Sequence, residues 1–183
     1  MSNKEIKSEI IKRLSQGDLK SELFDQYKDD VNEDVIRTIL ASRPSYLLWQ
    51  KFKRKHLLLS LIWGFFIFFE LFRILELVIE FNIEIVISII LSTYITINIW
   101  KFDGRFFLIG IIWFSLTIVG SFIEMNSLYY YNVDYKYIMI FVSMYSIVLS
   151  VGIYLMYHLR ETVFSYMEWF RPFLGNEEKR KFE

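Results

Sequence analysis

Charged residues interrupt the end of a long apolar run, and they are the first candidates for chemistry. The stretch at 68–84 reads F-F-E-L-F-R-I-L-E-L-V-I-E-F-N-I-E and follows apolar and aromatic residues that carry no charge. On a helix, Arg73, Glu76 and Glu80 share one face because they are spaced by three and four residues, and Glu70 lies at its edge. Glu70 and Arg73 are therefore a candidate polar pair within a membrane.

Two interpretations of this pair are open. In the first, the membrane-spanning part begins near Lys53 or Arg54, whose side chains reach the interface, and ends near Phe72, so that the charged residues beyond form a solvated extension. In the second, the span begins at Leu57, and Glu70 and Arg73 face the other helices as a pair that lines a polar cavity.

Small and hydroxyl residues form rows within the apolar runs. Small faces let membrane helices approach closely, and the alternative is a hydroxyl-lined pore. The candidate packing or pore-lining residues are Ser88, Ser92, Thr96, Asn98, Gly110, Gly120, Ser143, Ser146 and Ser150.

A basic stretch, K-F-K-R-K-H, precedes the first apolar run. We predict that it contacts anionic lipid headgroups through Lys51, Lys53, Arg54, Lys55 and His56. It is too short and too close to the membrane to indicate nucleic acid, and the net charge of zero gives no such indication either. A site shared by His56 and His158 requires that their helices adjoin.

Catalytic and cofactor signatures are absent from the sequence. It has no HExxH, GxSxG, Walker, GxGxxG or EF-hand pattern, and no cysteine for thiolate chemistry or a zinc site. The carboxylates Glu84, Glu124 and Asp134 indicate the translocated side of a membrane rather than a metal site. We predict no catalytic residue, no metal, no cofactor and no enzymatic activity.

The elements that must position these residues are helices. A helix needs about 20 mostly apolar residues to cross lipid, and in lipid the backbone must be satisfied within the segment. Four segments qualify or nearly qualify, at 57–78, 81–100, 106–123 and 137–157. The predicted fold class is all-α, with a four-helix transmembrane bundle over 51–157.

A helical module is expected before the bundle, over residues 1–50. Apolar residues at helical spacing predict three short helices, of which the first ends at Gly17 and the third is capped by Asn32. Pro44 is expected to end that third helix or the segment just after it. After the bundle, 158–183 is expected to hold an interfacial helix that includes Val163 and Met167, or a straight continuation of the fourth span, and then a disordered tail.

Orientation follows from lysine and arginine near the helix ends. These residues concentrate before the first span, between the second and third, and after the fourth, whereas the opposite side is acidic. We expect both termini in the cytoplasm and, since the N-terminus lacks an apolar core for a cleaved signal peptide, a bacterial inner (plasma) membrane location.

The predicted function is that of a non-enzymatic sensor, anchor or assembly subunit that works through its cytosolic N-terminal helices. Its expected partners are the lipid bilayer and either further copies of itself or another membrane or cytosolic protein. The alternative is a small oligomeric ion channel or transporter that uses Glu70, Arg73 and the hydroxyl-lined helix faces.

Overall fold

The computed structural model describes residues 3–29, 31–79, 82–128 and 135–169, with only the backbone described at 3–4, 73–79 and 127–128. The side chains of Arg73 and Glu76 lie outside the described residues, as do Glu80, Asp134 and the predicted tail from 170 onward. The described chain forms α1 (Asn3–Gln16), α2 (Lys20–Tyr27), α3 (Glu33–Ala41), α4 (Tyr46–Ile79), α5 (Ile83–Trp100), α6 (Arg105–Leu128) and α7 (Tyr135–Val163).

Four of these helices are long and apolar enough to cross a membrane. The candidate spans are Tyr46–Phe72, Ile83–Trp100, Arg105–Asn126 and Tyr135–Val163. The structure confirms the predicted all-helical fold and four helices whose length and apolar composition suit a membrane span. These four helices indicate a membrane protein.

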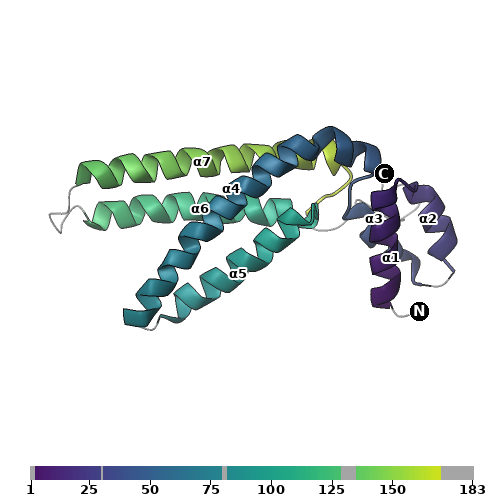
Figure 1. Cartoon of the computed structure of the whole chain (residues 1–183), viewed down its shortest axis with the longest axis horizontal. Helices are drawn as coiled ribbons and strands as arrows, with labels where there is room; N and C mark the ends of the chain where they lie inside the picture. The colour runs from purple at the N-terminus through teal and green to yellow at the C-terminus, as the bar shows by residue number, and fades with distance from the viewer. Residues whose placement is uncertain (1–2, 30, 80–81, 129–134, 170–183) are drawn as a thin grey trace.

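The four long helices form two hairpins, α4 with α5 and α6 with α7 (Figure 1). We call the end at which the turn 101–104 joins α5 to α6 the proximal end, and the opposite end the distal end. Figure 1 shows that the hairpins lie together proximally and diverge distally. Helices α1 to α3 lie beyond the proximal end.

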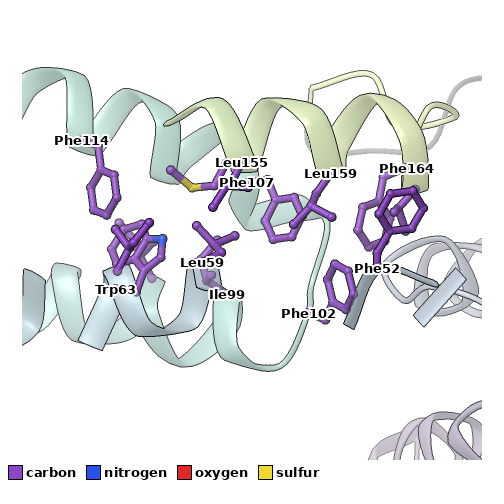
Figure 2. Close-up of a cluster of buried hydrophobic side chains, with 14 of the residues drawn as sticks. Phe52, Leu59, Trp63, Ile99, Phe102, Phe107, Phe114, Leu155, Leu159 and Phe164 are labelled. Carbon is purple, nitrogen blue, oxygen red and sulfur yellow. The ribbon is translucent and has the colours of Figure 1, made fainter. Parts of the chain in front are cut away.

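The core of the bundle is aromatic and permits close helix contacts. Trp63 of α4 stacks on Phe114 of α6 with ring centroids 4.2 Å apart. A Cβ added to Gly110 would lie 2.6 Å from the sulfur of Met156, and one added to Gly152 would lie 2.6 Å from Phe114. Helices α6 and α7 therefore meet across glycines, as small-residue packing in membranes requires. Figure 2 labels Phe52, Leu59, Trp63, Ile99, Phe102, Phe107, Phe114, Leu155, Leu159 and Phe164 in this core.

The N-terminal helices have a separate core. It is formed by Ile6, Ile10, Leu14, Leu23, Tyr27, Ile36, Ile39 and Leu40. α1 ends before Gly17, which has a φ of 111° that glycine adopts readily. The Asn32 side chain accepts a hydrogen bond from the backbone N–H of Asp34 at 2.9 Å and so caps α3.

The chain after α7 differs from the predicted interfacial helix. α7 continues to Val163, and residues 164–169 then form turns instead of a further helix. The reason is tertiary: Phe164 is fully buried and packs against Phe102 and Phe107, at 5.8 and 5.6 Å between ring centroids. Met167 is also buried, and a turn places both side chains against the bundle.

Candidate functional site

A polar cavity of about 230 Å³ lies in the distal half of the bundle, and all four long helices line it. Its walls are Phe69 and Glu70 of α4, Ser88 of α5, Thr117, Gly120, Ser121 and Glu124 of α6, and Tyr145 of α7. Because these residues belong to helices otherwise rich in apolar side chains, the cavity is a local exception to the packing of the bundle.

Glu70 occupies a core position of α4. It continues the buried stripe of Leu59, Trp63 and Phe66 at helical spacing, and it is only 7% exposed. The Ser88 hydroxyl donates a hydrogen bond to Glu70 Oε2 at 3.1 Å, which links α4 to α5. A carboxylate at such a position is costly to bury unless it is hydrogen-bonded or paired. The burial of Glu70 matches the interpretation in which it faces the other helices, and its pairing with Arg73 stays a prediction.

The hydroxyl oxygens that α6 places in the wall of this cavity can act only as hydrogen-bond acceptors toward a further partner. Thr117 donates to the Trp113 carbonyl at 3.0 Å, and Ser121 donates to the Thr117 carbonyl at 2.9 Å. With their protons used within the helix, these oxygens offer only lone pairs to another partner. Gly120 has no atom within 4 Å of an added Cβ, so it faces open space. Oxygen acceptors beside a buried carboxylate suit a cation or a proton donor.

Other residues of the predicted rows pack helices together. Trp113 Nε1 donates to the Ser92 hydroxyl at 3.0 Å and connects α6 to α5. Thr96 is buried and donates to the Ser92 carbonyl at 2.7 Å. Ser92, Thr96 and Gly110 are thus buried at helix contacts outside the distal cavity.

The remaining members of the rows lie elsewhere. Asn98 donates to the Tyr94 carbonyl at 2.8 Å within its own helix. Ser146 is buried, whereas Ser143 and Ser150 are exposed on the outside of α7. Of the predicted set, the structure brings together Glu70, Ser88 and Gly120 at the cavity.

A second group of polar residues joins the N-terminal helices to the proximal end. Lys20 is 2% exposed, and its ammonium donates to the Tyr166 hydroxyl at 2.9 Å. That hydroxyl donates to the Ala41 carbonyl at 3.1 Å. The backbone N–H of Gly104 donates to the Ser42 carbonyl at 3.1 Å. We call these contacts, with the arginine–aspartate contacts described next, the proximal junction.

Asp103 is the electrostatic centre of the proximal junction. Its side chain is 1% exposed and accepts hydrogen bonds from Arg105 Nε and Nη2 at 3.0 and 2.6 Å. It also accepts from the backbone N–H of Arg105, the first residue of α6, at 3.2 Å. Arg43 lies 3.9 Å from the same carboxylate and donates to the Lys101 carbonyl. Burial lowers the pKa of Arg43, and Asp103 opposes that shift.

The basic stretch divides into exposed and half-buried parts. Exposed side chains are those of Lys51, Lys53, Arg54 and Lys55. His56 is half-buried, stacks on Phe102 at 4.1 Å and donates from Nε2 to the Ile99 carbonyl at 2.8 Å. His158 instead accepts from the Lys55 ammonium at 2.6 Å, so the two histidines have different partners.

Sequence reasoning missed the roles of Arg43, Asp103 and Tyr166. A local signal existed for Asp103, because an Asp-Gly pair between two apolar runs is typical of a turn that caps the next helix. The contact of Tyr166 with Ala41 joins residues 125 positions apart, which no local pattern reveals.

Comparisons of the chain with protein-family models, with curated proteins and with solved structures found no match. Within the described ranges, no group of three or more His, Asp or Glu side chains is placed to hold a metal ion. Function is therefore inferred from the contacts, burial and charges of the described residues.

Proposed function

We propose that this protein is a non-enzymatic integral membrane protein that acts as a sensor, anchor or assembly subunit through its N-terminal helices. The observation that carries the proposal is the proximal junction. Hydrogen bonds from Lys20, Tyr166 and Gly104 tie a module with its own core to a membrane-type bundle. A module held in this way presents one surface to a partner at a fixed position next to the membrane.

The orientation proposed for this assembly has the proximal end in the cytoplasm. The exposed cations of 51–55 and Lys101 are at that end, whereas Glu84 and Glu124 are toward the distal end. Lysine and arginine concentrate on the cytoplasmic side of membrane proteins. Both termini would then be cytoplasmic, in a bacterial inner membrane.

The partner surface proposed for the module includes Val35. This side chain is 41% exposed on α3, and Leu19, just before α2, is 57% exposed, whereas the core residues of the module are buried. A second copy of the chain or another protein would cover it. Introducing a charge there should weaken the association because the charge would have to be desolvated.

The test is the mass of the intact complex after mild extraction from native membranes. We expect a mass above the 22.2 kDa of one chain, and a loss of the added mass in Val35→Glu. Ser21→Glu, which places the same charge on an exposed position of α2, is the matched control and should keep the complex. A lone chain of 22.2 kDa in gentle detergent argues against a partner.

A second candidate function, a small oligomeric ion channel or transporter, is favoured by the distal cavity. Glu70 and Ser88 contribute a carboxylate and a hydroxyl to a space lined by four helices. Intramembrane carboxylates of this kind mark ion and proton pathways.

Glu70→Gln separates the two functions because it keeps the size of the side chain and removes its charge. If the cavity conducts cations, the variant should lower cation flux into liposomes roughly tenfold or more while insertion is unchanged. Ser143→Ala, on the exposed face of α7, should conduct like the wild type. Absence of flux in the wild-type protein, or equal flux in Glu70→Gln, removes this candidate.

A further inference from the structure

A second cavity, of about 170 Å³, lies at the proximal end, where the N-terminal helices meet the bundle. The lining residues that matter here are Arg43, Lys101, His56, Tyr46, Trp49 and Trp100. Trp100 is the last residue of a candidate span, so the cavity is at the depth of the membrane–water interface. Its volume holds several water molecules, and hence a group the size of a phosphate.

The charges around this cavity do not balance. Two guanidinium groups, those of Arg43 and Arg105, share the single carboxylate of Asp103. Arg105 makes close hydrogen bonds to both carboxylate oxygens, whereas Arg43 approaches only to 3.9 Å. Lys101 adds a further cation at the cavity wall. The local charge is therefore positive, in a place where the Arg43 side chain is only 12% exposed.

Arg43 also has unused hydrogen-bonding capacity. One of its terminal nitrogens donates to the Lys101 carbonyl. Its Nε is buried and has no hydrogen-bond partner within the described part of the chain. A guanidinium presents its N–H donors in a fixed planar arrangement that matches the oxygens of a phosphate. An oxyanion would therefore accept a hydrogen bond from Arg43 Nε, which has no partner among the described residues.

The imidazole of His56, which also lines the cavity, already has its own partners. His56 donates from Nε2 to the Ile99 carbonyl, and its ring stacks on Phe102. The cationic contacts of a ligand therefore fall to Arg43 and Lys101. Trp49 and Trp100 flank them with indole rings, which favour the interfacial depth of a membrane.

We propose that the proximal cavity binds a phosphate group, with Arg43 and Lys101 as its cationic ligands. The phosphate belongs either to the headgroup of an anionic phospholipid or to a soluble phosphate compound. This site is separate from the distal cavity and does not depend on either function proposed above.

The test uses the full-length protein and two probes. Dioleoylphosphatidylglycerol is titrated into the detergent-solubilised protein, and bound lipid is counted by native mass spectrometry. Inorganic phosphate is titrated separately into protein in phosphatidylcholine nanodiscs, and the shift in thermal unfolding is measured. Arg43→Gln and Lys101→Gln should each raise the apparent dissociation constant of the bound probe roughly tenfold or more, as expected for a lost charge-assisted hydrogen bond.

Lys7→Gln is the matched control, since Lys7 is an exposed cation of α1 that neither lines the cavity nor belongs to the basic stretch at 51–56. It should change the dissociation constant less than about twofold. If Arg43→Gln fails to fold, Lys101→Gln decides alone, because Lys101 is exposed.

The two probes separate the sources of the phosphate. Binding of the lipid alone assigns the site to a headgroup, and binding of inorganic phosphate assigns it to a soluble compound. The proposal is overturned if neither probe binds, if Lys101→Gln binds like the wild type, or if Lys7→Gln weakens binding as much as the cavity variants do.

Discussion

Asp103→Asn perturbs the proximal junction at its most buried charge. The carboxylate is 1% exposed and receives three hydrogen bonds from Arg105, two from the side chain and one from the backbone. Asparagine keeps the shape of the side chain but replaces one acceptor oxygen with a donor. That donor would face a guanidinium that also only donates, and Arg43 would lose its neighbouring anion.

The magnitude follows from the exposure of the two arginines. Removing one partner of a buried ion pair costs about 3–5 kcal/mol. The Arg105 side chain is 29% exposed and can recover some hydration, whereas Arg43 is 12% exposed and recovers little. We therefore expect a loss of about 3 kcal/mol in the free energy of unfolding, at the lower end of that range.

The assay is reversible unfolding of the full-length protein in mixed micelles, followed by tryptophan fluorescence. Asp25→Asn is the control, because Asp25 forms an ion pair with Lys28 at 2.9 Å but is 69% exposed. The control should unfold like the wild type, since exposed pairs contribute little. A change below about 0.5 kcal/mol in Asp103→Asn would refute the view that this carboxylate holds the junction together.

Two further predictions concern packing and hydrogen bonding in the same assay. An added Cβ at Gly104 would lie 2.5 Å from the ring of Phe164, so Gly104→Ala should destabilise the protein by about 1–3 kcal/mol. Gly120→Ala, with open space around it, should be neutral or stabilise helix α6 by up to about 1 kcal/mol; equal losses in both variants would contradict the packing. Tyr166→Phe removes the hydroxyl that receives the Lys20 ammonium and should cost about 1–3 kcal/mol. Unchanged unfolding of Tyr166→Phe would show that this hydroxyl does not support the junction.

The four spans could be predicted from the sequence because length and apolarity decide them. The start of α4 could not, since the basic residues around Phe52 interrupt the hydropathy. In the structure, Phe52 is buried on the same stripe as Leu59 and Trp63, and α4 begins at Tyr46. The predicted interfacial helix is not confirmed: at 164–169 the burial of Phe164 against the α5–α6 turn outweighs a local helical pattern.

The candidate sites were predictable only in part, for a physical reason. A charged residue on the apolar stripe of a helix is visible in the sequence, and Glu70 was found in that way. The cavity beside Glu70 forms where the two hairpins diverge, and the sequence of one helix does not predict that arrangement. The junction residues Arg43 and Tyr166 act through contacts between distant segments, so their side chains carried no local signal.

The docking of the N-terminal helices on the proximal end is the claim on which the proposed function rests. It is tested most directly by photo-crosslinking the full-length protein in membranes, with p-benzoylphenylalanine in place of Tyr166. The Tyr166 ring lies 4.9 Å from the Lys20 ammonium, and its hydroxyl lies 3.1 Å from the Ala41 carbonyl. We expect crosslinked peptides that contain α2 or the end of α3. Crosslinks only to lipid or to the long helices would contradict the docking.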